Sequence, residues 1–223
     1  NSNIAILSGD VMMIQAYQLL SEVDSNILKE VLDIFSKTAI QVCEGQQWDM
    51  DFEMQKNVNL VEYMKMIEYK TAVLMAASLQ IGAITAGASN KDQAHIYEFG
   101  LNMGIAFQLK DDLLDVFGNP EAFGKQVGGD IMANKKTFLN LKALQLADDS
   151  NKEKLQFYYM NNDKSKSKVN SVKSIFTKLH IQSHTIDLMK VHYTKAIEHL
   201  DAIRSENKAP LIGFADKLME RIS

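Results

Sequence analysis

The stretch Phe107–Phe117, FQLKDDLLDVF, places three aspartates, Asp111, Asp112 and Asp115, among mostly apolar residues. On a helix, Asp111 and Asp115 lie on one face a turn apart, and Asp112 lies about 100° round from Asp111. Like charges at this spacing cost a few tenths of a kcal/mol, and burying a carboxylate without a partner costs far more. The stretch therefore predicts a helix whose carboxylates face something cationic.

The helical pattern extends over nearly the whole chain. Long segments carry apolar residues at i, i+3, i+4 and i+7, strand-like alternation is absent, and only two prolines, Pro120 and Pro210, occur. We predict an all-α fold in one domain, residues 1–223, with Met160–Ser171 as its most loop-like segment. The predicted helices lie at about 3–20, 26–46, 58–88, 92–117, 134–147, 152–160, 169–182, 184–204 and 209–221.

Composition narrows the function classes. The net charge of −4 gives no basic field for a nucleic acid or an anionic membrane surface. The longest apolar run, 72–88, is interrupted by polar residues and falls short of the ~20 residues that span a bilayer, so we expect a buried helix there. The single Cys43 excludes an internal disulfide framework and fits a reducing compartment. Because the chain opens without Met and in mid-pattern, we expect an upstream segment.

The acidic motif suits Mg²⁺. This ion prefers octahedral oxygen ligands and typically takes one or two carboxylates, several waters and phosphate oxygens of a substrate. The alternative is a solvated acidic face, which the apolar neighbours Leu113, Leu114 and Val116 disfavour. The motif therefore indicates a divalent metal site on the helix.

Two further segments carry candidate binding groups. Gly124–Phe138, GKQVGGDIMANKKTF, follows the acidic helix and contains lysines that can fold back over a polyphosphate; the alternative is a basic surface turn. Lys70 and Thr71 are a polar pair between an amphipathic half, 58–69, and an apolar half, 72–88, of one predicted helix. We interpret this pair as part of a site at a kink in that helix.

Four motifs in this order resemble the trans-isoprenyl diphosphate synthases, the polyprenyl synthetase family that includes farnesyl and geranylgeranyl diphosphate synthases. They are GQQWDMDF at Gly45–Phe52, YKT at Tyr69–Thr71, GLNMGIAFQLKDDLLDV at Gly100–Val116 and GKQVGGDIMANKKT at Gly124–Thr137. The resemblance covers nearly the entire chain. It implies an isoprenoid synthase helical bundle around a central cavity and a cytoplasmic homodimer without a membrane span. It also implies a prenyltransferase that uses up to three Mg²⁺ ions to condense isopentenyl diphosphate with an allylic diphosphate, releasing diphosphate and a longer trans-prenyl diphosphate.

The resemblance also implies roles for individual residues. The implied catalytic residues are Lys70, Thr71, Gln108 and Asp111. The implied substrate-binding residues are Gln46, Lys70, Thr71, Phe107, Gln108, Lys125 and Lys135. The implied metal ligands are Asp49, Asp111, Asp112 and Asp115. In this assignment the lysines bind diphosphate, and the dipoles of Thr71 and Gln108 stabilise positive charge at the allylic carbon.

One family feature has no match in the chain. A first Asp-rich motif followed by paired arginines is expected upstream of NIAILSGDVMMIQAYQLL, residues 3–20, and nothing in these residues matches it. We expect that an N-terminal part of the enzyme is missing, or that the chain is a non-catalytic partner subunit. A terpene cyclase shares the metal and diphosphate chemistry, but D-D-x-x-D followed by Gly124–Lys125 favours chain elongation over cyclisation.

Overall fold

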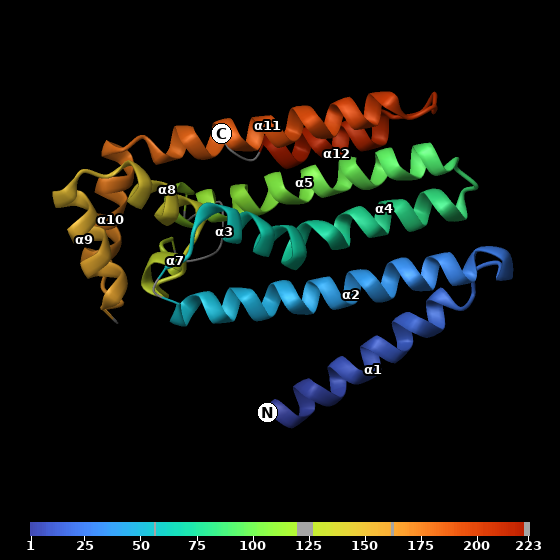
Figure 1. Ribbon diagram of the computed structural model, residues 1–223, viewed down its shortest axis with the longest axis horizontal. Helices are drawn as coiled ribbons and strands as arrows, with labels where there is room; N and C mark the ends of the chain where they lie inside the picture. The colour runs from blue at the N-terminus through green and yellow to red at the C-terminus, as the bar shows by residue number, and fades with distance from the viewer. Residues whose placement is uncertain (56, 120–126, 162, 221–223) are drawn as a thin grey trace.

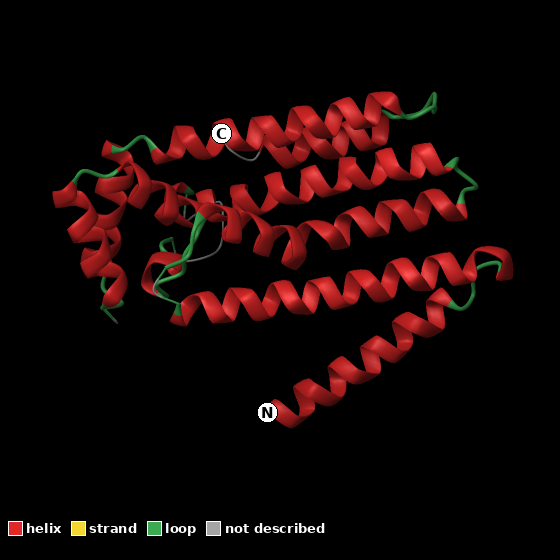
Figure 2. Cartoon of the chain, viewed as in Figure 1, coloured by secondary structure: helices red, strands yellow, loops and turns green. Residues whose placement is uncertain are grey.

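The computed structural model describes residues 1–55, 57–119, 127–161 and 163–220, and these are helical with no strand among them (Figures 1 and 2). The all-α prediction is confirmed. In chain order the elements are α1 Ser2–Leu20, α2 Ser25–Met54, α3 Leu60–Ile67, the π-helix η1 Glu68–Ala72, α4 Val73–Thr85, α5 Asn90–Phe117, α7 Gly129–Met132, α8 Phe138–Leu146, α9 Asp149–Met160, α10 Lys166–Lys178, α11 Ile181–Ala202 and α12 Ala209–Glu220.

The predicted helix 58–88 is three elements. The helix begins at Leu60, where Asn59 and Glu62 form a capping box, and it passes through η1 before continuing as α4. The π-helix η1 contains both Lys70 and Thr71, so the polar pair for which a kink was predicted lies where the helix departs from α-helical geometry. A π-turn holds one more residue than an α-turn and is often found at functional sites.

Three predicted boundaries are wrong. The helix predicted to end at 46 runs on to Met54 and therefore carries Asp49. The helix predicted over 134–147 begins at Phe138, because Asn134 has a φ of 57° and reverses the chain after the short helix α7. The expected loop over Met160–Ser171 gives way to α10 at Lys166, with the Ser165 side chain accepting a hydrogen bond from the Lys168 N–H as the N-cap.

Helix α5 is the central element of the bundle. Figure 1 shows α2, α4, α5, α11 and α12 running alongside one another, with α5 packed against both α4 and α11. Two glycines of α5 let α4 and η1 pack closely against it. A Cβ on Gly100 would lie 2.7 Å from Cα of Ala76 in α4, and a Cβ on Gly104 would lie 2.5 Å from Cα of Ala72 in η1. This contact fixes η1 against the middle of α5.

Two apolar clusters hold α5 along its length. One cluster surrounds its C-terminal half and includes Tyr63, Leu109, Leu113 and Phe176. The other packs its N-terminal half against α11 and α12, and includes Phe99 and Leu200. The acidic motif therefore lies on a helix whose N-terminal and C-terminal halves are both held by apolar packing.

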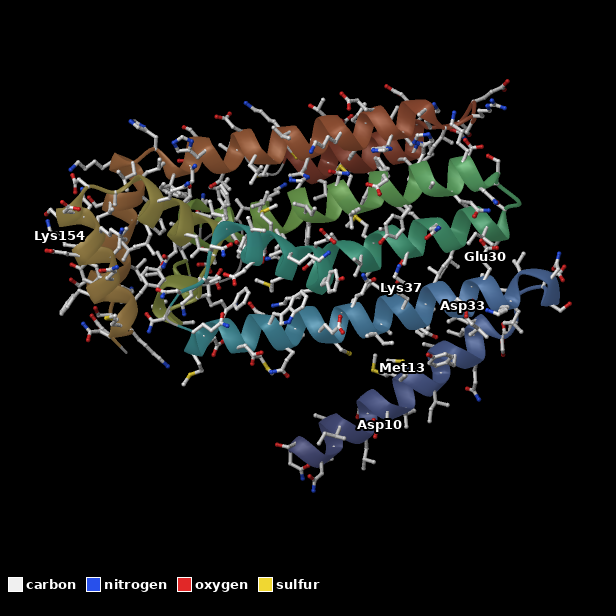
Figure 3. All side chains as sticks on the ribbon, viewed as in Figure 1. Asp10, Met13, Glu30, Asp33, Lys37 and Lys154 are labelled. Carbon is white, nitrogen blue, oxygen red and sulfur yellow. The ribbon has the colours of Figure 1, made fainter. Side chains whose placement is uncertain are left out.

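Helix α1 buries no residue. It diverges from α2 toward the N-terminus (Figure 1), and its side chains, Asp10 among them, stand in open space along much of the helix (Figure 3). It is held mainly near its C-terminal end, where the Tyr17 ring packs edge-on against Phe35 of α2 at 5.1 Å and its hydroxyl lies 3.0 Å from Ser36 Oγ. Large apolar side chains that are at least half exposed on α1 are Ile4, Ile6, Leu7, Val11, Met12, Ile14 and Leu19.

None of the described helices is long and apolar enough to cross a membrane.

Candidate active site

Residues of α2 press directly on the π-turn. A Cβ on Gly45 would lie 2.3 Å from the backbone nitrogen of Lys70, so only glycine fits at this position without a shift of backbone. One turn further along α2, the Trp48 ring stacks on Tyr69 with centroids 5.1 Å apart. The two elements that carry the GQQWDMDF and YKT motifs are thus packed backbone to backbone.

Asp49 and Lys70 form an ion pair across this contact. Lys70 Nζ lies 2.6 Å from Asp49 Oδ2, and the two side chains are 29% and 20% exposed. The sequence assigned Asp49 to the metal and Lys70 to diphosphate, and in this structure the two groups neutralise one another. A diphosphate bound with its metal would give each group a new partner of opposite charge: the negative diphosphate for Lys70 and the positive metal ion for Asp49.

A chain of hydrogen bonds links η1 to the acidic motif. Thr71 Oγ1 donates to Gln108 Oε1 at 2.9 Å, and Gln108 Nε2 donates to Asp112 Oδ1 at 3.0 Å. The Tyr63 hydroxyl donates to the other oxygen of Asp112. Residues 49 positions apart in the sequence are therefore joined through one carboxylate.

Burial changes the ionisation of this carboxylate. Asp112 is 4% exposed. Burial raises the pKa of Asp112 to about 7, although the hydrogen bonds from Tyr63 and Gln108 act in the opposite direction. The pKa of Tyr63 is raised well above its usual value, mainly by burial and secondly by the charge of Asp112, so the Tyr63 hydroxyl keeps its proton and remains a hydrogen-bond donor.

The other two aspartates of the motif differ from Asp112. Asp115 is half-buried and accepts the backbone N–H of Asp130 at 3.0 Å. The pKa of Asp115 is raised, mainly by burial and secondly by the charge of Asp130. Asp111 is also half-buried, and its carboxylate makes no hydrogen bond or ion pair with any described residue. Of the three, Asp111 is the carboxylate with free oxygens.

Asp130 is a site residue that the sequence analysis missed. Lys135 Nζ lies 3.0 Å from Asp130 Oδ1. Burial alone would lower the pKa of Lys135, but the negative charges of Asp130, Asp49 and Asp112 have the larger combined effect, and the pKa of Lys135 is raised. Asp130 is the single acidic residue in the glycine-bearing segment Gly124–Phe138, but only its contacts with Lys135 and Asp115 mark it as part of the candidate site.

The remaining predicted residues lie outside this network. Phe107 is 43% exposed on α5, next to Gln108. Gln46 is exposed on α2, beside Gly45. Lys125 lies outside the described residues. The structure therefore brings together Asp49 with Lys70, Thr71 with Gln108 and Asp112, and Lys135 with the additional residue Asp130.

The donor set fits Mg²⁺ that arrives with phosphate oxygens. No group of three or more His, Cys, Asp or Glu side chains in the described ranges is arranged to hold a metal ion. Mg²⁺ rarely occupies an all-protein cage and usually keeps waters and substrate phosphates among its ligands. The free carboxylate of Asp111 could supply one hard oxygen ligand, and Asp112 beside it could supply a second when it is ionised.

Comparisons with known proteins identify both the isoprenoid synthase fold of this all-helical bundle and its family. The polyprenyl synthetase profile matches residues 1–177. A geranylgeranyl diphosphate synthase of Sulfolobus acidocaldarius is 36% identical over 211 residues, or 93% of this chain and 64% of that protein. A short chain isoprenyl diphosphate synthase of Methanothermobacter thermautotrophicus is 35% identical over 220 residues, or 98% of this chain and 67% of that protein. The chain belongs to the polyprenyl synthetase family.

A solved structure gives the same result for the fold. The crystal structure of a geranylgeranyl pyrophosphate synthase matches with a TM-score of 0.91 and 41% identity, covering 99% of this chain and 69% of that one. The chain thus spans about two-thirds of the length of these relatives.

Proposed function

We propose that this protein is a Mg²⁺-dependent prenyltransferase that condenses isopentenyl diphosphate with an allylic diphosphate to give a longer trans-prenyl diphosphate. The observation that carries the proposal is the hydrogen-bond chain Thr71–Gln108–Asp112 beside the free carboxylate of Asp111. The geranylgeranyl and short chain isoprenyl diphosphate synthases named above support the same class of reaction.

The proposed reaction begins by breaking the C–O bond between the allylic carbon and its diphosphate. The bonding electrons leave with diphosphate, so negative charge grows on the leaving group. Mg²⁺ held by Asp111, with Asp112, Asp115 and Asp49 as further proposed ligands, would neutralise part of this charge. In this proposal Lys70 and Lys135, together with Lys125 outside the described residues, bind the diphosphate oxygens and stabilise the transition state more than the substrate.

Thr71 and Gln108 are proposed to act on the positive carbon. Gln108 Oε1 accepts only the Thr71 hydroxyl among the described residues, and an amide oxygen has a second lone pair that can face a cation. The double bond of isopentenyl diphosphate then forms the new C–C bond, and the proton lost from it goes to the released diphosphate. This route requires no His or Cys as a base.

Substrate-binding roles for Gln46 and Phe107 belong to the same proposal. We further propose that residues 1–223 form one domain, because both apolar clusters draw on α5. We propose a homodimer, because the exposed apolar side chains of α1 need a cover. We propose a cytoplasmic location on the family resemblance, and the free thiol of Cys43 fits a reducing compartment.

A product assay tests the proposed function. The purified protein is incubated with Mg²⁺, isopentenyl diphosphate and a set of allylic diphosphates, and the products are resolved by carbon number. We expect longer prenyl diphosphates and released diphosphate. A cyclised hydrocarbon would assign the chain to the terpene cyclases. Turnover that requires a second, different polypeptide would assign it as a partner subunit.

A further inference from the structure

Lys168 of α10 is a buried lysine that forms no ion pair within 4 Å of a described carboxylate; Asp163 acts on it only at longer range, and its ammonium lies 5.8 Å from the centre of the Tyr159 ring. It is 1% exposed. Its ammonium group donates to the side-chain oxygen of Asn134 and, at 3.3 Å, to the backbone oxygen of Asn161. Lysine is almost never fully buried unless it is paired, because the ammonium loses its hydration. The burial of the Lys168 ammonium therefore has a desolvation cost, which its hydrogen bonds to two amide oxygens offset in part.

Asn134 is one of the described non-glycine residues with a positive φ, 57°. It follows α7 and closes the helix with two hydrogen bonds: Asn134 N–H to Ile131 O at 3.2 Å and Lys135 N–H to Asp130 O at 2.9 Å. This reversal is the Schellman motif, in which glycine is the commonest residue at the left-handed position. Here asparagine is used, and its side chain also donates to Asn161 O at 3.2 Å.

The reversal places Lys135 against the residues of the acidic site. Its side chain lies back over α7 and reaches Asp130, whose own N–H binds the Asp115 carboxylate. The first turn of α10 also contacts the other end of α7, since a Cβ on Gly128 would lie 2.4 Å from Val169 Cγ1. Figure 1 shows α7 and α10 side by side at one end of the bundle, in agreement with their contacts.

We propose that Lys168 is a positioning residue that acts through Asn134, holding the chain reversal that presents Lys135 to a bound diphosphate. This inference rests on the proposed function. Lys168 touches no substrate in this account. Its role is to fix the left-handed conformation of Asn134, and through it the direction in which Lys135 leaves α7. The buried ammonium does this because any movement of the Asn134 side chain breaks two hydrogen bonds, from Lys168 to Asn134 and from Asn134 to Asn161, and leaves Asn161 O as the one remaining hydrogen-bond acceptor of the ammonium among the described residues.

A double-mutant cycle tests the proposal, with calorimetric binding of inorganic diphosphate in excess Mg²⁺ as the readout. The variants are Lys168→Met, Lys135→Ala and their combination. If Lys168 acts through Lys135, Lys168→Met weakens binding roughly tenfold alone and has almost no effect when Lys135 is already alanine. Lys166→Met removes the same charge from an exposed position two residues away, and it should leave binding unchanged.

A second variant covers the case in which Lys168→Met fails to fold. Asn134→Gly keeps the left-handed backbone but deletes the oxygen that Lys168 binds, and we expect the same dependence on Lys135. Equal weakening with and without Lys135, or no weakening, would overturn the positioning role. If the unaltered protein binds no diphosphate, the proposed function itself fails, and the inference fails with it.

Discussion

The aspartates of the acidic motif occupy three environments, although they lie within five residues of sequence. Asp112 is buried and accepts hydrogen bonds from Tyr63 and Gln108, Asp115 accepts a backbone N–H, and Asp111 has free oxygens. The side chain of Asp111 is therefore the one most directly available to a metal ion. Asp112 and Asp115 each accept hydrogen bonds from neighbouring residues, so part of their acceptor capacity is already used within the fold.

We expect Asp111→Asn to lower kcat for prenyl transfer by about 100-fold or more, because the amide keeps the shape but removes the charge that binds Mg²⁺. Steady-state kinetics with saturating Mg²⁺ checks this. Asp51→Asn, at an exposed position on α2, is the matched control and should retain its activity. Unchanged kcat in Asp111→Asn would remove this residue from the proposed site.

Asp112 predicts a pH dependence of stability. Its pKa of about 7 in the folded protein lies above the value near 3.9 expected for an unfolded chain, so the folded state binds more protons between these values. The free energy of unfolding should therefore fall as pH rises from about 4 to about 7. Urea unfolding at pH 5 and pH 8 should show a smaller fall in Asp112→Asn than in the unaltered protein.

The residual slope in that variant has an expected source, because the pKa of Asp115 is also raised by burial. Identical slopes in Asp112→Asn and the unaltered protein would show that Asp112 is ionised at all these pH values.

At the scale of elements, the position of η1 depends on glycines in its neighbours. Gly45 of α2 lies against the backbone of Lys70, and Gly104 of α5 lies against Ala72. Neither contact depends on a polar group. Both set the distance between the helix backbones, and thereby place Lys70 and Thr71 between Asp49 on one side and Gln108 on the other.

We expect Gly45→Ala to lower the free energy of unfolding by about 1–3 kcal/mol, because the new methyl group must displace the backbone of η1. It should also weaken diphosphate binding, since Lys70 moves with that backbone. Gly82→Ala in α4 is the control: no atom lies within 4 Å of its added Cβ, and alanine should stabilise the helix by about 0.5–1 kcal/mol. Equal urea midpoints for the two variants would contradict this account.

The helices could be predicted from the sequence because apolar periodicity is a local property. The polar pair Lys70–Thr71 also indicated an interruption, although not that it is a π-turn. The start of α8 could not be predicted, because the left-handed conformation of Asn134 depends on Lys168, which lies 34 residues later. Helix α10 begins inside an apparently loop-like segment because Val169, Val172 and Phe176 are buried by other elements.

At the scale of the whole molecule, polar contacts between distant segments were beyond prediction from local pattern. Tyr63 binds Asp112, and Lys136 donates to the backbone oxygen of Phe52, 84 residues away. The motifs identified most of the candidate site, but Asp130 and Tyr63 became visible only through the packing. Residue type reveals which chemistry is present, and tertiary contacts decide which groups are free to perform it.

The proposed homodimer has a direct test in α1. We expect Leu7→Lys with Met12→Lys to convert a dimer into a monomer, because both side chains are more than 60% exposed in the single chain and belong to the row of exposed apolar side chains on α1. Sedimentation velocity measures the mass. Gln15→Lys, at an exposed polar position of the same helix, should leave the dimer intact. A monomeric mass for the unaltered protein would refute the homodimer.

The π-turn also restricts how this region can change in length. Its additional residue is the one that a regular α-turn does not hold. Deleting one residue from η1 would therefore leave a continuous α-helix in which Ala76 of α4 keeps its contact with Gly100 of α5. The residues inside η1 would be redistributed at about 100° steps, so that Lys70 and Thr71 could no longer both reach their present partners, Asp49 and Gln108. The packing of the helices would accept a change of length here that the polar contacts of the site would not.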